Sequence, residues 1–335
     1  MRLQSYALAA ALAITAFGSA RAAGTLERIT VHAPSLEGNL EGDSADRDVF
    51  VYLPPSYGSS PEQRYPVVYA LHGYSGTAEY WVQAISLPDS ADAAIAAGAD
   101  EMIIVSPDAN TVHAGSMYSN SVTIGDWESF IAEDLVAYID ANYRTVATRD
   151  SRGLAGHSMG GYGTVRIGMK RPEVFSSLYI LSPCCLGARG ATGDTIATLE
   201  SLTTVDEVRA SGFLGLGTFA VAAAWSPNPN NPPFYVDLPT KDGEVQQDVL
   251  NRWAANAPLA MLDQYVPALK SYEAIAMDVG NMDPGLADIQ RLHDRMTAFG
   301  VAHSYEIYEG DHGSRVGERW EKHVIPFFSE HLDAE

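Results

Sequence analysis

The feature that most constrains the fold is the stretch RGLAGHSMGGYGTVRIGMKRPEVF, residues 152–175. It begins with a short apolar run, passes through Gly-His-Ser-Met-Gly and continues as an amphipathic segment. The apolar run predicts a buried strand over 152–156, and the helical spacing after it predicts a helix over 159–170. The serine therefore lies in a sharp, glycine-flanked turn between a strand and a helix, which is typical of folds in which these elements alternate.

Strands and helices alternate along most of the chain. ERITVHAPSL and RDVFVYLPPSY alternate apolar and polar residues, as half-buried strands do. The strand cores at 67–71 and 102–105 are continuously apolar, which is typical of central strands in a parallel sheet. We expect further strands at 177–182, 273–280 and 304–310, and helices at about 77–98, 125–144, 286–299 and 315–332. The pattern predicts an α/β fold with a mostly parallel sheet and helices on both faces.

Residues 186–270 interrupt this alternation. The segment is rich in glycine and then contains WSPNPNNPPFYVDLP, in which proline and asparagine disfavour regular structure. Helices are expected only at 245–256 and 258–270. We interpret the segment as an insert over the carboxyl edge of the sheet that shapes a substrate site, within a single domain of residues 23–335.

The first 22 residues, MRLQSYALAAALAITAFGSARA, have the pattern of a secretory signal peptide. A basic start precedes an apolar run that is too short to span a bilayer, and Ala20 and Ala22 form an A-x-A cleavage site. We therefore expect cleavage after Ala22 and a periplasmic or secreted protein.

The charge and the cysteines limit the possible partners and crosslinks. The chain has 21 Lys and Arg against 42 Asp and Glu, a formal net charge of −21, which disfavours binding to nucleic acid or insertion into an anionic membrane. The oligomeric state is not indicated. Cys184 and Cys185 are adjacent, with Cα atoms about 3.8 Å apart, closer than ordinary disulfide geometry permits. This favours two small buried apolar residues over a strained vicinal disulfide.

Ser158 is the candidate nucleophile. The sequence Gly156-His157-Ser158-Met159-Gly160 matches the G-x-S-x-G pattern, whose turn needs glycine and presents the serine hydroxyl above the sheet. The helix that follows would place the Met159 amide and the positive end of its dipole near an oxyanion formed there. The alternative is a glycine-rich turn that contains an incidental serine.

His312 is the candidate base, because a serine nucleophile needs one. It follows the last predicted strand in YEGDHGSR, at the same edge of the sheet as Ser158. Its acid partner is expected in AMDVGNMDPGL, where Asp283 lies in the loop past the strand and is favoured, and Asp278, still within the strand, is the alternative. The order serine, aspartate, histidine is that of α/β-hydrolases.

A second oxyanion donor is expected from the loop HGYSGTAEYW, which follows the strand that ends at Leu71. Gly73 there allows the backbone to approach closely, so the Tyr74 amide is the candidate.

At these residues the chain resembles the esterase D family of α/β-hydrolases, which includes S-formylglutathione hydrolases, feruloyl and acetyl-xylan type esterases and mycolyltransferase antigens. The resemblance covers most of 45–185 and 270–330 and is carried by LHGYSG, by the blocks around Trp127 and Ser158, by DVGNMD and by YEGDHGSRVGERW. It implies an α/β-hydrolase fold with Ser158 as nucleophile, His312 as base, Asp283 as acid, and the Tyr74 and Met159 amides as oxyanion hole.

The resemblance also bears on the substrate pocket. It implies that Tyr118, Ser119 and Trp127 approach the site, with packing as the alternative. In the insert, Trp225, Phe234 and Tyr235 could contact an aromatic acyl group or instead anchor the insert to the core. The signal peptide and the long insert argue against glutathione adducts as substrates.

The expected function is that of a secreted serine carboxylesterase that acts on a small or polymer-borne ester through an acyl-enzyme and needs no metal or organic cofactor. An acyltransferase with the same three residues is the first alternative, because water and an alcohol compete for one acyl-enzyme. A binding protein on an inactive hydrolase fold is the second.

Overall fold

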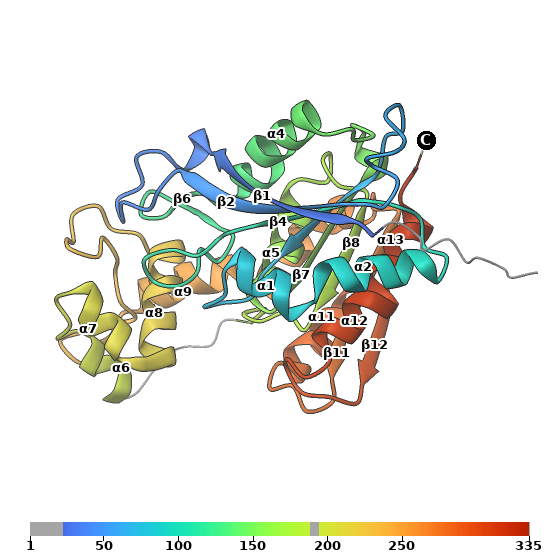
Figure 1. Ribbon diagram of the computed structural model, residues 1–335. Coiled ribbons are helices and arrows are strands. Elements are labelled where there is room, and N and C mark those ends of the chain that lie inside the picture. Colours follow the sequence, from blue (N-terminus) through green and yellow to red (C-terminus); the bar gives the residue numbers. More distant parts are fainter. Residues whose placement is uncertain (1–22, 188–193, 335) are drawn as a thin grey trace, which may run out of the picture.

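The computed structural model describes residues 23–187 and 194–334. The predicted signal peptide, residues 1–22, lies outside these residues. The described residues form one large sheet with strand order β1-β2-β4-β3-β7-β8-β11-β12, in which β1, β2 and β4 pair antiparallel and the strands from β4 to β12 pair parallel (Figure 1). Its strands are β1 (Thr25–His32), β2 (Asp46–Leu53), β3 (Val67–Leu71), β4 (Ile103–Pro107), β7 (Arg152–His157), β8 (Ser177–Leu181), β11 (Ala274–Gly280) and β12 (Ser304–Tyr308).

Helices cover both faces of this sheet because successive side chains of its buried strands point to opposite sides. In β3, Val68 and Ala70 pack with one set of helices, whereas Val67, Tyr69 and Leu71 pack with the other. The first set comprises α1 (Ala78–Ala84), α2 (Leu87–Ala96), α12 (Val316–Arg319) and α13 (Ile325–His331); the second comprises α4 (Leu135–Asn142), α5 (Met159–Lys170), α10 (Pro258–Leu269) and α11 (Leu286–Ala298). The predicted fold class is therefore confirmed.

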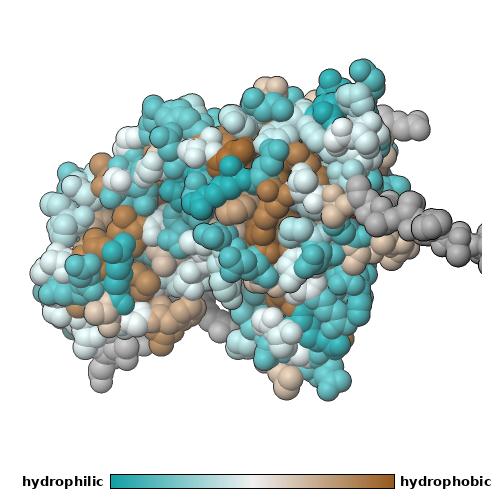
Figure 2. Space-filling view, in the orientation of Figure 1, coloured by the Kyte–Doolittle hydropathy of each residue, from teal (hydrophilic) through white to brown (hydrophobic). Residues whose placement is uncertain are grey.

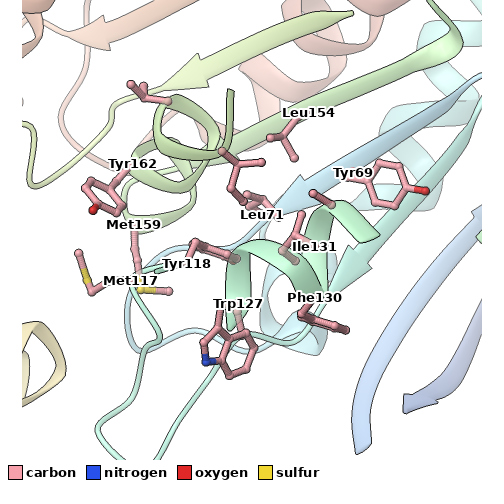
Figure 3. Packing of buried hydrophobic residues seen from close by; sticks show 14 of the residues in the cluster. Tyr69, Leu71, Met117, Tyr118, Trp127, Phe130, Ile131, Leu154, Met159 and Tyr162 are labelled. Carbon is pink, nitrogen blue, oxygen red and sulfur yellow. The ribbon is translucent and has the colours of Figure 1, made fainter. Parts of the chain in front are cut away.

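The hydrophobic core on the α5 side of the sheet supports the strands next to the turn that carries Ser158. In Figure 3, Leu71 from β3 lies beside Ile131 from the helical segment after β6 (Gly125–Asp126), and Leu154 from β7 and Phe130 belong to the same buried cluster. All four side chains are fully buried. The strand ends that carry the site therefore rest on close-packed side chains, which limits their movement.

Two of the predicted helices are interrupted in the structure. The helix expected over 77–98 is two helices, α1 and α2, separated at Ser86, whose φ of 46° is left-handed. Pro88 lies in the first turn of α2, where the missing amide is tolerated, but it could not continue a helix from α1. The helix expected over 125–144 contains α3 (Trp127–Ser129), a π-helical turn (Phe130–Asp134) and then α4.

The insert is more helical than predicted. Besides α9 (Gln247–Asn256) and α10, it contains α6 (Asp194–Leu199), α7 (Val205–Ala210) and α8 (Gly212–Trp225). Most of α8, GFLGLGTFAVAAAW, is apolar on every side, so it lacks the periodicity by which an amphipathic helix is recognised. In Figure 1 helices α6 to α8 (yellow) form a lobe at the left, and Figure 2 shows hydrophobic residues at the surface of this part of the molecule.

Short elements complete the described chain. They are the 3-10 turns Pro34–Leu36 and Arg149–Ser151, the π-helical turn Trp320–Val324, and the two-residue strands β5 (Asn120–Ser121), β6 (Gly125–Asp126), β9 (Thr240–Lys241) and β10 (Glu244–Val245). Of the helices in the described ranges, none is both long and apolar enough to cross a membrane.

Candidate active site

Ser158 occupies a strained turn between β7 and α5. Its φ of 58° and ψ of −114° lie outside the regions that L-residues ordinarily adopt. A side chain at Gly156 would collide with the carbonyl of Gly160, and one at Gly160 would collide with the carbonyl of Leu71. The glycines are therefore required by the close approach of three backbone segments, and this packing holds the serine in its strained conformation.

The structure brings Ser158, His312 and Asp283 together from three segments that are far apart in sequence. The Nε2 of His312 lies 2.8 Å from the hydroxyl oxygen of Ser158, and its Nδ1 lies 2.7 Å from Oδ2 of Asp283. The loops after β11 and β12 carry Asp283 and His312 to the carboxyl edge of the sheet, where β7 also ends. This is the relative placement required of a nucleophile, a base and an orienting acid.

The Asp283 carboxylate is buried but well supported. Its side chain is 1% exposed, whereas that of His312 is 40% exposed. Burial by itself raises the pKa of Asp283, but hydrogen bonds from His312 and from the Gly285 amide outweigh it and hold the pKa below its usual value. The carboxylate is thus ionised at neutral pH and can stabilise an imidazolium at His312.

Asp278 lies in β11, before the loop that carries Asp283, and its side chain does not contact His312. It accepts hydrogen bonds of 2.9 Å from the Tyr179 hydroxyl and from Nε of Arg319, on the face opposite α5. Burial raises the pKa of Asp278 to about 6, against the opposing effect of Arg319. Its contacts are those of a buried structural ion pair, so the geometry separates the two candidate acids.

The two expected oxyanion donors flank Ser158. Gly73 approaches so closely that a Cβ added there would lie 3.4 Å from the Cβ of Ser158, which places the backbone that leads to Tyr74 beside the nucleophile. Met159 is the first residue of α5, at the positive end of its dipole. His72 supports the loop, since its Nδ1 lies 2.8 Å from the Gly73 carbonyl while its Nε2 accepts a hydrogen bond from the Ala109 amide.

A cavity of about 600 Å³ opens beside Ser158 and His312. Its walls are mostly apolar. The insert contributes Phe213, Leu214, Val221, Trp225 and Trp253 to them, and Met117 comes from the segment before α3. Cavities of this size and polarity are typical of sites for small organic ligands. No group of three or more His, Cys, Asp or Glu side chains that could hold a metal ion occurs within the described ranges.

Of the residues expected at the substrate pocket, Trp225 lines the cavity and Tyr118, Ser119 and Trp127 do not. These three are buried behind it. The Tyr118 hydroxyl donates to the His72 carbonyl, Ser119 accepts a hydrogen bond from the Trp225 indole, and Trp127 packs in the core near Phe130 (Figure 3). They lie outside the pocket because their side chains are fully buried in contacts with the core, although the neighbouring Met117 lines the cavity.

The aromatic residues of the insert also fall into two groups, those that line the cavity and those that pack away from it. Trp225 and Trp253 both line the cavity, and their rings pack edge to face. Phe234 packs against Phe219 and His113, away from the cavity, and so anchors the insert. Met117, Val221 and Trp253 were not evident as cavity residues from the sequence, and the only signal for Val221 was the apolar character of α8.

His157 lies within the serine turn, and its packing partners could not be predicted from the sequence. Its Nε2 lies 2.6 Å from the His312 carbonyl oxygen, and its ring stacks on Trp81 with centroids 5.9 Å apart. Burial lowers the pKa of His157 to about 4, so the ring is neutral at ordinary pH and its Nε2–H donates to that carbonyl. His157 thereby connects the serine turn to the histidine loop.

This connection predicts different effects for two amide substitutions. We expect His157→Gln to keep kcat within about threefold, because its amide nitrogen can reach the His312 carbonyl. The shorter His157→Asn should lower kcat about 10–100-fold with KM little changed, since a displaced base loses its alignment with the nucleophile. Measurement of kcat, KM and the pH profile of kcat/KM tests this; equal losses in both variants, with equal unfolding midpoints, would contradict it.

Comparison with known proteins shows that the chain is similar to several esterases. The esterase family model, described as "Putative esterase", matches residues 44–330. An esterase of Mycobacterium tuberculosis is 38% identical over 133 residues, which is 38% of this chain and 27% of that protein. An endo-1,4-beta-xylanase/feruloyl esterase of Xylanibacter ruminicola is 33% identical over 138 residues, 39% of this chain and 19% of that protein. The chain thus spans about a quarter or less of the length of these curated relatives.

Solved structures of several hydrolases share the fold. A ferulic acid esterase has a TM-score of 0.66 at 21% identity, covering 92% of this chain and 98% of that one. An S-formylglutathione hydrolase from Staphylococcus aureus has a TM-score of 0.62 at 17% identity, covering 91% of this chain and 99% of that one. At these identities the likeness establishes the fold alone.

Proposed function

The chain belongs to the esterase family, and on that premise we propose that it hydrolyses carboxylic esters through an acyl-enzyme on Ser158. The observation that carries the proposal is the continuous hydrogen-bonded chain from Ser158 through His312 to Asp283, beside a cavity large enough for an ester. The proposal is tested by measuring whether the full chain hydrolyses p-nitrophenyl esters from acetate to laurate and a ferulate ester. Hydrolysis is the expected result.

The chemistry follows from the positions of these groups. Ser158 Oγ attacks the ester carbonyl while His312 Nε2 takes its proton, and ionised Asp283 stabilises the imidazolium. The Tyr74 and Met159 amides bind the negative charge that develops on the carbonyl oxygen. His312 then protonates the leaving alcohol. Water repeats the sequence on the acyl-enzyme, which releases the acid and restores the serine.

We further propose that the preferred acyl group is bulky and apolar. Val221, Trp225 and Trp253 line the same cavity as Ser158, and burial of apolar surface against them favours such a group by about 25 cal/mol per Å². An acetyl group would leave most of this volume unfilled. The feruloyl esterases among the relatives and structural neighbours are consistent with an aromatic acyl group.

Filling the cavity is expected to reverse this preference. Val221→Trp, on α8, should lower kcat/KM for the laurate or ferulate ester at least about tenfold while changing acetate hydrolysis less than about threefold, because only large acyl groups need the occupied volume. Val245→Trp is the matched control, since Val245 lies in the same insert but is 50% exposed and outside the cavity. A uniform loss across the ester series would contradict the assignment of the acyl site.

A further inference from the structure

The two adjacent cysteines lie in the wall of the candidate active site. Both Cys184 and Cys185 line the cavity together with Ser158 and His312, and both side chains are half-buried. Their sulfur atoms are 2.7 Å apart, with both residues as free cysteines. As the sequence favoured, both cysteines are free and pack against the hydrophobic core, but they are only half-buried and also line the cavity.

The backbone of this dithiol is connected to the nucleophile. The Cys184 amide donates a hydrogen bond of 3.1 Å to the carbonyl of Ser158, at the turn before α5. Cys185 has a left-handed φ of 60°, and the following residue, Leu186, accepts a hydrogen bond from the Leu259 amide in α10. The cysteines are thus the junction between the end of β8, the serine turn and the insert.

We propose that Cys184 and Cys185 are a redox-active dithiol, which a low-molecular-weight disulfide such as oxidised glutathione converts to a vicinal disulfide, and that this conversion slows turnover at Ser158. The effect on turnover rests on the proposed function, whereas the oxidation does not. Disulfides persist in oxidising compartments, to which the export predicted from the leader sequence would deliver the chain.

The reaction is thiol–disulfide exchange in two steps. The Cys185 thiolate attacks one sulfur of the small disulfide, forms a mixed disulfide and releases one small thiol. Cys184 then attacks the sulfur of Cys185, which forms the protein disulfide and releases the second small thiol. Two protein thiols are oxidised, one small disulfide is reduced to two thiols, and the protons of the cysteines end on those thiols. Contact with Cys185 and burial raise the pKa of the Cys184 thiol, which suits Cys184 to the second, intramolecular step.

Ring closure has to move the backbone. The sulfur atoms must approach from 2.7 Å to about 2.05 Å, and adjacent Cα atoms lie closer together than in ordinary disulfides. The movement occurs where the Cys184 amide holds the Ser158 carbonyl, so it displaces the nucleophile relative to His312. A displacement near 1 Å is sufficient to cost a large factor in rate.

The test treats the full chain with oxidised glutathione and follows thiol content, intact mass and reaction with a fluorophosphonate probe. The two thiols should fall to none, with the loss of two hydrogen atoms in mass and no glutathione adduct. Probe labelling of Ser158 and ester hydrolysis should slow at least about fivefold and recover with dithiothreitol. Cys184→Ser and Cys185→Ser are the controls, because neither can close the ring and any mixed disulfide would be detected by its mass.

The outcomes separate the two proposals. If both thiols remain, or if a mixed disulfide persists, the proposal that the dithiol is redox-active is wrong. If the protein disulfide forms but probe labelling and hydrolysis are unchanged, the proposal that it slows turnover is wrong. If the reduced protein neither reacts with the probe nor hydrolyses esters, the proposed function fails and the effect on turnover fails with it, while the thiol count still decides the oxidation.

Discussion

Replacing Ser158 by alanine is expected to lower kcat for ester hydrolysis by about 10⁴-fold or more, because without the nucleophile no acyl-enzyme forms. Only the oxyanion amides and substrate binding would then assist the attack of water. The unfolding midpoint should change little, since the hydroxyl lies at the cavity surface and its hydrogen bond is to the half-exposed His312. The measurements are steady-state hydrolysis of the p-nitrophenyl series and labelling by a fluorophosphonate.

A buried serine outside the candidate site provides the control. Ser90 lies on α2, on the opposite face of the sheet, and its hydroxyl donates to the Ile85 carbonyl. Ser90→Ala should keep full activity and its probe labelling, and any loss should be of stability. Substantial turnover by a clean preparation of Ser158→Ala, with labelling at another residue, would remove Ser158 from the proposed mechanism.

The second large effect is expected at Asp283. Asp283→Asn should lower kcat by about 10³–10⁴-fold, because the amide neither fixes the required tautomer of His312 nor stabilises its positive charge. KM should change little, since the carboxylate faces the histidine. The measurement is kcat and KM with the best ester of the series, beside a thermal unfolding curve.

Asp278→Asn is the matched control, since it makes the same chemical change five positions earlier in the chain. Asp278 faces Arg319 and Tyr179, not His312, so kcat should stay within about threefold while the unfolding midpoint falls, because a buried ion pair loses one partner. The reverse pattern, with activity lost in Asp278→Asn and retained in Asp283→Asn, would exchange the roles of the two aspartates.

Much of the fold could be predicted because its signals are local. Continuous apolar runs marked β3 and β4, and the strand, glycine turn and helix around Ser158 lie within 24 consecutive residues, 152–175. The structure confirms the α/β class, and the family match over 44–330 confirms the resemblance. Helix α8 was missed because its apolar residues surround the helix. The break at Ser86 was missed although Pro88, which cannot continue a helix from α1, was a local signal for it.

The sequence by itself determined the alternating α/β pattern, the serine turn and the short set of candidate partners, because residue periodicity and glycine spacing act through neighbouring residues. Only the tertiary structure decided which aspartate reaches His312, that Tyr118 and Trp127 belong to the core, and that the cavity is walled by Val221, Trp225 and Trp253. It alone placed His157 against the His312 carbonyl and the two cysteines beside Ser158. These contacts join residues far apart in the chain, and their distances depend on how the loops at the carboxyl edge pack together, which no local pattern encodes.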